Sequence, residues 1–312
     1  MPLDHLTHLD IGPIVAELRN LREHSLAQRQ RECRPPKLPS RSVLRDIVEG
    51  LATAMYPNRL GSGEQTHEGI DYYVGHTLDA KLRLLVGQIQ RELRFAAEQA
   101  GKLEPDAECC RQEALERVRR FIQTLPKVRA LLDTDLQAAY EGDPAARSVD
   151  EVLVCYPGIA AITNHRLAHE LYCLDLPLIA RMIAEIAHSQ TGIDIHPGAQ
   201  IGPSFFIDHG TGVVIGETTI IGKRVRLYQA VTLGAKRFPT DENGILLKGH
   251  ARHPIVEDDV VIYAGATLLG RITIGRGSTI GGNVWLTRSV PPESNISQAQ
   301  ARQELFIHGA GI

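Results

Sequence analysis

Aliphatic side chains recur every six positions over the stretch from Ile193 to about Pro291. Glycine follows many of them, as in Ile201-Gly202. An amphipathic strand would repeat every two residues, and a helix would lose about 1 kcal/mol at each interior glycine. The pattern is typical of hexapeptide repeats, which wind into a parallel β-helix with the aliphatic side chains stacked inward. The aliphatic positions are Ile195, Ile201, Ile207, Ile215, Ile221, Leu227, Leu233, Val256, Ile262, Leu268, Ile274, Ile280 and Leu286.

The repeat is interrupted twice. The step from Ile207 to Ile215 is eight residues instead of six, and the two extra residues fall in Asp208-His209-Gly210-Thr211-Gly212. Between Leu233 and Val256 lies a longer insertion, rich in Gly, Pro, Lys, Arg and His, which is expected to leave the coil as a loop. Loops that interrupt a rigid repeat tend to carry function, so both interruptions are candidate functional segments.

The residues before the repeat show helical spacing instead. Ser40 is expected to cap a helix that ends near Tyr56-Pro57 and carries an aliphatic stripe. Residues 57–70 are expected to form a loop because they are rich in Pro, Gly and Ser. Further helices are expected at about 73–99, 106–125, 126–140, 158–174 and 176–190. The stripe after Ser40 consists of Val43, Leu44, Ile47, Val48 and Leu51.

These patterns predict an α+β fold class, an all-α domain followed by a parallel β-helix. A weakly ordered N-terminal arm covers 1–40, the helical domain 41–190, the β-helix 191–292 with an extruded loop at about 235–254, and a C-terminal tail 293–312. The 312 residues, 43% of them hydrophobic, suffice for two ordinary cores. Because a coil end exposes unpaired strand edges, a helix or a partner must cover it.

Composition narrows the classes of function. A formal net charge of -3 and 5% aromatic residues argue against a nucleic-acid-binding protein. The N-terminus lacks the features of a secretory signal, and no apolar run of about 18 residues occurs, which predicts a soluble cytoplasmic protein that does not bind membranes. The five cysteines form no CxxC pair and are expected to be reduced thiols.

Candidate chemistry lies in the two interruptions. His209 follows Asp208 in the first, and Asp194 lies fifteen positions earlier, or about one coil if a coil takes roughly eighteen residues. A carboxylate there would hold one imidazole nitrogen and leave the other free as a base near neutral pH. The alternative is that Asp208-His209 only closes a corner by hydrogen bonding. In the second interruption, Arg252 is suited to a carboxylate ligand and stands beside His253; a solvated basic loop is the alternative.

Several motifs together resemble the serine O-acetyltransferase family, which makes O-acetylserine from L-serine and acetyl-CoA for cysteine synthesis. The resemblance covers about residues 140–292 closely and the helical part in outline. The motifs are Asp194-Ile195-His196-Pro197, Asp208-His209-Gly210-Thr211-Gly212, Gly216-Glu217-Thr218, Thr232-Leu233-Gly234 and Arg252-His253-Pro254.

The resemblance implies a role for each matching residue. His209 is the expected general base on the serine hydroxyl, Asp194 orients it, and His253 is a second active-site histidine. Arg252 is expected to bind the serine carboxylate. The remaining expected contacts are Asp143 and Asp208 to the serine amino group, Glu217 as a weaker polar contact, and Gly234 and Ala235 to CoA.

The resemblance also implies a left-handed β-helix and a homotrimer, or a dimer of trimers, with active sites between neighbouring coils. Acetyl-CoA is expected along the coil groove as a co-substrate, with no metal and no permanently bound cofactor. This chain departs from the family pattern in a loop some nine residues longer, with Phe238-Pro239-Thr240-Asp241 inserted, and in its final coil, which reads Ile296-Ser297-Gln298-Ala299-Gln300.

Two further partners follow from the resemblance. L-Cysteine is expected as a feedback inhibitor that fits the serine pocket. The C-terminal Ile312 is expected to enter the active site of O-acetylserine sulfhydrylase. The alternative is that Ile occurs at this position by chance. Alternatives to the main function are an acyltransferase for homoserine or a sugar, and a zinc-dependent hydratase of the same fold that would use His196, His209 and His253.

Overall fold

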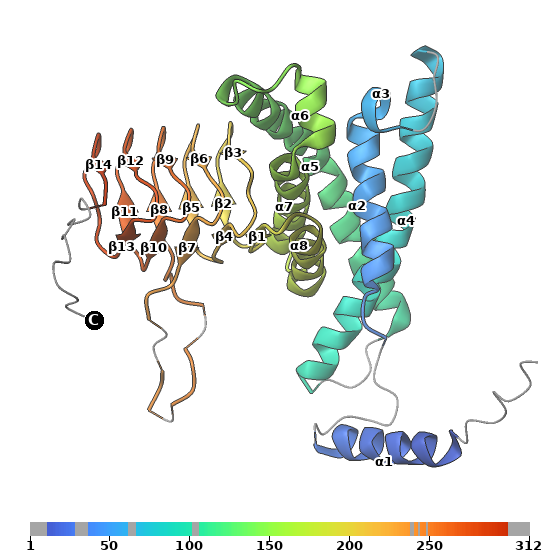
Figure 1. The fold of residues 1–312 in the computed structure, drawn as a ribbon. Coiled ribbons are helices and arrows are strands. Elements are labelled where there is room, and N and C mark those ends of the chain that lie inside the picture. Colours follow the sequence, from blue (N-terminus) through green and yellow to red (C-terminus); the bar gives the residue numbers. More distant parts are fainter. Residues whose placement is uncertain are drawn as a thin grey trace, which may run out of the picture.

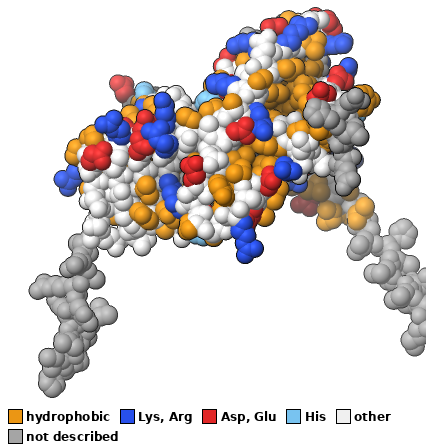
Figure 2. All heavy atoms as spheres, turned by 90° about the horizontal axis from the view of Figure 1, so that it is seen from above, with side chains coloured by type: hydrophobic (Ala, Val, Ile, Leu, Met, Phe, Trp, Pro, Cys, Tyr) orange, Lys and Arg blue, Asp and Glu red, His pale blue; other side chains and the backbone are white. Residues whose placement is uncertain are grey.

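The computed structural model describes residues 11–28, 37–61, 67–101, 106–237, 240–242, 244–247 and 249–298. A group of helices is followed by a coil of short strands. The turns of the coil stack on one another and extend away from the helices (Figure 1). Seen from the side drawn in Figure 2, acidic and basic side chains are interspersed over the coil, while hydrophobic side chains gather over the helical part. No helix among the described residues could span a membrane. The cytoplasmic location stays a prediction.

The structure has eight helices among the described residues. The longest two, α4 and α5, pack against each other, and the coil is contacted by α5, α7 and α8 (Figure 1). The bounds are α1 (Gly12–Gln28), α2 (Arg41–Met55), α3 (Pro57–Leu60), α4 (His67–Gln99), α5 (Ala107–Gly142), α6 (Val149–Cys155), α7 (Pro157–Cys173) and α8 (Pro177–Thr191).

The helix predicted after Ser40 is confirmed as α2, whose stripe is largely buried. Ser40 stands at the N-cap position but makes no side-chain cap bond; its backbone N–H donates to Gln88 Oε1 (2.7 Å) instead. The prediction of a loop over 57–70 was wrong in part, because α3 and the first turn of α4 lie within that range. Pro57 is the first residue of α3, a position where the missing N–H costs nothing.

The two helices predicted to meet at Pro126 are one continuous helix, α5. A proline in a helix interior removes a hydrogen bond and costs roughly 3 kcal/mol. Phe121 and Leu125 are buried before it and Val128 after it, so one packed face runs through the proline. That packing outweighs the local cost.

The coil contains fourteen short strands among the described residues, and every pairing between them is parallel. Three sheets result, in the orders β1-β4-β7-β10-β13, β11-β8-β5-β2 and β14-β12-β9-β6-β3. The bounds are β1 (Asp194–Ile195), β2 (Gln200–Ile201), β3 (Phe206–Ile207), β4 (Val214–Ile215), β5 (Ile220–Ile221), β6 (Arg226–Leu227), β7 (Thr232–Gly234), β8 (Ile255–Val256), β9 (Val261–Ile262), β10 (Thr267–Leu269), β11 (Thr273–Ile274), β12 (Thr279–Ile280), β13 (Trp285–Leu286) and β14 (Asn295–Ile296).

The predicted aliphatic positions form three ladders, one inside each sheet. In the first sheet, Ile195 pairs with Ile215, Ile215 with Leu233, and Leu233 with Leu268. Most of these side chains are almost fully buried. The hexapeptide prediction is therefore confirmed, and the fold is an all-α domain followed by a left-handed parallel β-helix, an exception to the right-handed rule for parallel connections.

The ends of the chain depart from the expected segments. Helix α1 lies within the arm predicted to be weakly ordered, although none of its residues is buried. Strand β14 pairs with β12, so the coil continues past the predicted boundary at 292. The long loop leaves the coil after β7 and returns at β8 (Figure 1). Residues 1–10 of the arm, Phe238 and Pro239 of the insertion, and the tail from 299 to Ile312 lie outside the described residues.

A buried ion pair joins the helical domain to the first coil. Arg166 of α7 donates to both carboxylate oxygens of Asp135 of α5 (2.6 and 2.9 Å). The same guanidinium donates to the carbonyls of Ile201 and Gly202, and Asp135 accepts from the backbone N–H of Phe205. Both side chains are almost inaccessible to solvent, at 4% and 0%. The pair thus fixes the corner between β2 and β3 against the helices.

Candidate active site

The first interruption of the repeat forms the corner between β3 and β4. His209 adopts a left-handed backbone conformation there (φ 59°), and its side chain is 72% exposed. Its Nε2 lies 3.9 Å from Asp208 Oδ1. The two extra residues lengthen the first coil, so that Asp194 pairs with Val214 instead of the residue eighteen positions on. The insertion therefore presents an imidazole to solvent from a rigid corner.

Two further carboxyl-bearing residues accompany His209. Asp208 is buried and accepts a hydrogen bond from Arg226 Nη2 at its Oδ2 (2.6 Å). Asp143 follows the last residue of α5, where the Tyr156 hydroxyl donates to its Oδ2 (2.5 Å) and the backbone N–H of Ala145 to its Oδ1 (2.8 Å). These hydrogen bonds, the one from Tyr156 above all, hold the pKa of Asp143 below its usual value. We call Asp143, Asp208, His209 and Arg226 the His209 site.

Asp194 lies beside the His209 corner but makes different contacts. The backbone N–H of Asp194 donates to the carbonyl of Val213. The carbonyl of Gly192 accepts from the backbone N–H of Gly212, which belongs to the corner. The carboxylate of Asp194 lies 4.0 Å from Arg181 Nη1. Within the part of the chain that the structure describes, no hydrogen bond joins Asp194 to His209. The orienting role of Asp194 stays a prediction.

The second group of predicted residues lies at the corner after the strands of the β1-β4-β7-β10-β13 sheet. Arg252 donates to Glu217 Oε2 (2.6 Å), and the Tyr172 hydroxyl of α7 donates to Glu217 Oε1 (3.2 Å). The Tyr172 ring meets the His196 ring edge to face, with centroids 5.8 Å apart. Burial is the largest single influence on Glu217 and raises its pKa, but the hydrogen bonds from Arg252 and Tyr172 and the positive charges nearby together outweigh burial, so the pKa is lowered. We call Tyr172, His196, Glu217, Arg252 and His253 the His253 site.

His253 is held in one orientation. The backbone N–H and the hydroxyl of Thr218 both contact its Nδ1 (3.1 and 2.9 Å). Because Nδ1 accepts the backbone N–H, we infer that the proton of the neutral ring is on Nε2. A side chain at Gly216 would stand 2.0 Å from the ring, so only glycine leaves room for it. His253 is therefore set as a hydrogen-bond donor through Nε2.

Burial lowers the pKa of His253 to about 4, assisted by the neighbouring charge of Arg252. The unfolded chain takes up this proton near the ordinary pKa of about 6.5, so the unfolded state binds more protons between the two values. We expect the free energy of unfolding to fall as the pH drops from about 6.5 toward 4, and His253→Asn to fall less steeply. Denaturant unfolding at pH 5 and pH 7 measures this. The matched control is the exposed His76→Asn, and an equal slope for both variants would contradict the expectation.

The two sites do not meet within one chain. The His209 site lies at the corner where the chain enters the strands of the β1-β4-β7-β10-β13 sheet, and the His253 site lies at the corner where the chain leaves them. Among the described residues, no hydrogen bond or ion pair joins the two sites. Gly234 ends β7, and its carbonyl accepts from the backbone N–H of Gly270 (2.9 Å), while Ala235 begins the loop. The CoA contacts of Gly234 and Ala235 stay a prediction.

Three contact residues escaped the sequence reasoning, namely Tyr156, Tyr172 and Arg226, while Thr218 stood in a quoted motif without a role of its own. Tyr156 follows α6, a helix that was not predicted although Ser148 and Glu151 carry the spacing of a capping box. Ser148 Oγ indeed accepts from the backbone N–H of Glu151 (3.0 Å). Arg226 and Tyr172 carry no local signal, because their partners lie far away in the sequence. His165 is buried in α7 and His169 is half-buried there, and burial lowers the pKa of His165 strongly.

The possible metal ligands that lie together include Asp194 but neither His209 nor His253. Among the described residues, Glu185, His188 and Asp194 form a group of three whose ligand atoms lie within 4.8 Å of one another. The zinc alternative would instead need His209 from one corner with His196 and His253 from another. The described cysteines, Cys109, Cys110, Cys155 and Cys173, are free thiols, as expected.

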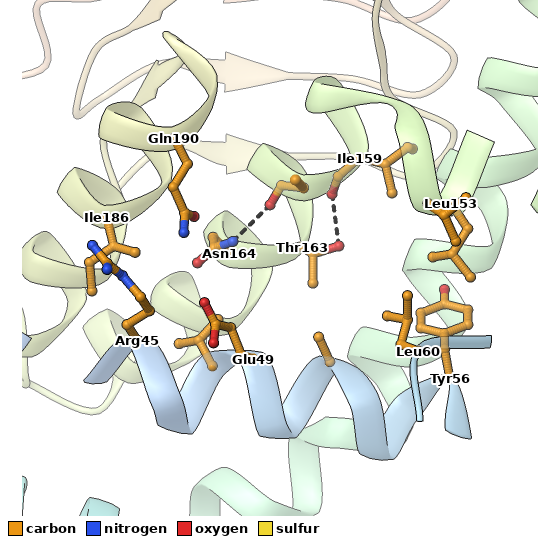
Figure 3. A pocket seen from close by; sticks show the side chains of 14 residues that line it. Arg45, Glu49, Tyr56, Leu60, Leu153, Ile159, Thr163, Asn164, Ile186 and Gln190 are labelled. Carbon is orange, nitrogen blue, oxygen red and sulfur yellow. Dashed lines mark hydrogen bonds between the residues drawn. The ribbon is translucent and has the colours of Figure 1, made fainter. Parts of the chain in front are cut away.

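A cavity of about 260 Å³ opens in the helical domain, away from both sites (Figure 3). Aliphatic side chains such as Leu60, Leu153 and Ile186 line much of it, with Arg45 and Glu49 from α2 at one side. None of the predicted site residues lines it. The candidate sites therefore lie outside this cavity, on the coil and at the helix ends beside it.

Known proteins similar to this chain match both its helical part and its coil. Residues 253–288 match the family model described as bacterial transferase hexapeptide (six repeats). The chain is 62% identical over 275 residues to a plasmid serine acetyltransferase of Synechococcus elongatus, covering 88% of this chain and 86% of that protein. The Entamoeba histolytica serine acetyltransferase isoform 3 in complex with cysteine is 32% identical, with a TM-score of 0.69 over 89% of this chain and 87% of that one. Soybean serine acetyltransferase complexed with serine is 28% identical, with a TM-score of 0.52 over 82% and 96%.

Proposed function

The chain belongs to the serine acetyltransferase family, and from that premise we propose that acetyl-CoA is its acetyl donor and that two neighbouring subunits build its active site. The protein is an acyltransferase that converts L-serine to O-acetylserine in cysteine biosynthesis. One observation carries the proposal about the site: the His209 site and the His253 site lie at opposite ends of the strands of one sheet. A homotrimer would bring the His209 site of one subunit to the His253 site of the next.

Each site supplies what one part of L-serine needs. Asp208 and Asp143 would accept hydrogen bonds from the ammonium group. Arg252 would bind the serine carboxylate through its planar fork. Because Arg252 already pairs with Glu217, the substrate would find the guanidinium held in place by that carboxylate. Opposite charges at opposite ends of the site match a zwitterionic amino acid.

The exposed imidazole of His209 would act as the general base. It would take the proton of the serine hydroxyl as the oxygen attacks the thioester carbonyl carbon, a contribution of about 10²- to 10⁴-fold. The C–S bond then breaks, and His209 returns the proton to the departing CoA thiolate. Asp194 would orient the imidazole. His253, with its proton on Nε2, would donate a hydrogen bond to the reacting groups.

The acetyl group is proposed to pass directly from CoA to serine within a ternary complex, since neither site contains a cysteine or serine among the residues that the structure describes. Holding both reactants side by side contributes to the rate. Acetyl-CoA would lie along the groove between coils, near Gly234 and Ala235, and helical domains of two trimers could join into a hexamer. An acetylated enzyme trapped without serine would overturn direct transfer, and sedimentation measures the assembly.

L-Cysteine is proposed as a competitive inhibitor. It differs from L-serine in one atom, and its ammonium and carboxylate groups would meet the same partners. The Entamoeba histolytica enzyme is described in complex with cysteine. Initial rates at several serine concentrations test this, because a constant inhibition at all of them would exclude competition.

The C-terminal Ile312 is proposed to bind O-acetylserine sulfhydrylase, with its terminal carboxylate in place of the substrate's. This rests on the sequence alone. The test compares binding of the full chain and of a chain lacking Ile312 to the sulfhydrylase. Equal binding would remove the proposal.

The function itself is tested by measuring thiol release from acetyl-CoA with L-serine, homoserine, a sugar or water as the acceptor. We expect release that depends on L-serine and exceeds that with the other acceptors. Release no greater than with water would overturn the acceptor assignment, and a preference for homoserine or a sugar would support the alternative acyltransferase. Metal analysis of the same preparation tests the zinc alternative.

A further inference from the structure

Arg226 contacts one carboxylate of the His209 site and the helix end that precedes the other. It lies on β6, in register with Phe206 of the preceding coil. Its Nη2 donates to Asp208 Oδ2, and its Nη1 donates to the carbonyl of Gly142, the residue just before Asp143, both at 2.6 Å. One guanidinium thus touches the coil residue and the helix end that carry the two acidic side chains.

The guanidinium of Arg226 is held in place by aromatic rings. It lies over Phe206, 4.9 Å from the ring centroid, and over Tyr228, 4.6 Å from the centroid. Tyr228 is itself stacked on Tyr263 of the next coil, with centroids 5.0 Å apart. A side chain at Gly142 would stand 2.9 Å from the Phe206 ring, so the carbonyl of Gly142 can approach only because this residue is glycine.

Arg226 places a positive charge among several negative ones. Asp208 and Asp143 are both acidic, and α5 ends at Gly142, where the helix dipole adds partial negative charge. A buried carboxylate such as Asp208 needs a partner. Arg226 offers positive charge to both and fixes their separation through the rigid geometry of its fork, which the single ammonium of lysine cannot do.

We propose that Arg226 is a positioning residue for the reaction: it sets the spacing and direction of Asp208 and Asp143 so that both meet the substrate ammonium group. This inference rests on the proposed function of those two carboxylates. Arg226 itself makes no contact with the substrate in this proposal. It acts through Asp208 and through the end of α5.

A neighbouring ion pair provides a matched control. Arg224, two residues before Arg226, donates to both oxygens of Asp259 (2.6 and 2.8 Å). This pair is half exposed, at 55% and 42%, and lies at the corner between β5 and β6, away from both sites. Loss of Arg224 removes an Arg–Asp pair of the same kind without touching Asp208 or Asp143.

The test measures steady-state kinetics of Arg226→Met, Arg226→Lys and Arg224→Met. For Arg226→Met we expect the KM for L-serine to rise about 10- to 100-fold, the loss typical of a hydrogen bond to a charged group. The KM for acetyl-CoA should change less than about twofold. Arg226→Lys should show a smaller rise in the KM for L-serine, because it keeps the charge but not the fork, and Arg224→Met should match the unaltered enzyme.

Substrate preference separates positioning from a general structural role. The ratio of kcat/KM for L-serine to that for 3-hydroxypropionate, which lacks the ammonium group, should fall in Arg226→Met and stay unchanged in Arg224→Met. If Arg226→Met does not fold, Tyr228→Leu, which removes one ring from the guanidinium, should lower the same ratio. An unchanged ratio, or an equal rise in the KM of both substrates, would overturn the proposal.

Asp208→Asn distinguishes the failure of this inference from failure of the proposed site. If Asp208→Asn leaves the KM for L-serine unchanged, the assignment of Asp208 to the ammonium group is wrong, and the role of Arg226 falls with it. If Asp208→Asn raises that KM while Arg226→Met does not, only the positioning role of Arg226 is overturned.

Discussion

Replacing His209 with alanine is expected to lower kcat for serine acetylation by about 10²- to 10⁴-fold, the usual contribution of a positioned general base. The loss should appear in kcat with little change in the KM for L-serine, because the proposed contacts to the ammonium and carboxylate groups remain. The fold should persist, since the side chain is 72% exposed. Thiol release from acetyl-CoA at saturating substrates is the measurement.

The matched control for His209→Ala is His76→Ala, which removes an exposed imidazole from α4 and should leave kcat unchanged. A loss of less than about tenfold in His209→Ala would contradict the general-base role. The same assay on Asp194→Asn tests the orienting carboxylate. We expect a smaller loss there, because the imidazole remains in the site.

The second large effect concerns stability. Arg166→Met is expected to lower the free energy of unfolding by about 3–5 kcal/mol, because it leaves the buried carboxylate of Asp135 without its partner. The carbonyls of Ile201 and Gly202 lose a donor as well. Since these groups lie where the first coil meets the helices, we expect the two parts to separate at lower denaturant concentration. Chemical denaturation followed by circular dichroism measures the change.

Two comparisons make the stability prediction specific. In Arg166→Met combined with Asp135→Leu, both charges are gone, and the loss should be smaller than in Arg166→Met alone. Arg59→Met breaks the exposed pair with Asp150, whose side chains are 54% and 55% exposed, and should cost about 0–1 kcal/mol. Similar losses for the Arg166 and Arg59 variants would show that burial of the pair contributes nothing.

The family relationship sharpens how the two sites are interpreted. A single chain presents acidic groups and a base at one corner and an arginine with a fixed histidine at another. Neither corner alone holds both His209 and Arg252, which the proposed reaction requires. If the catalytic unit is made from two subunits, as proposed, activity depends on assembly, and conditions that dissociate such an assembly should abolish activity while each coil stays folded.

Much of this protein followed from spacing along the chain. Aliphatic residues six apart must point the same way in a coil of three short sides, so the inward ladders of Ile195, Ile215 and Leu233 could be predicted from the period alone. The same reasoning located both interruptions of the repeat, and therefore His209 and the loop that ends in Arg252 and His253.

Contacts between distant segments could not be predicted this way. The packed face of α5 runs through Pro126, against its local helix propensity, because burial across the whole helix outweighs one missing hydrogen bond. Arg226 meets Gly142 across 84 positions and Tyr172 meets Glu217 across 45, and no local period encodes such pairs. The separation of His209 from His253 likewise depends on which corner each occupies. Periodicity specifies the repeating unit, whereas the way the coil stacks on the helices determines which side chains share a site.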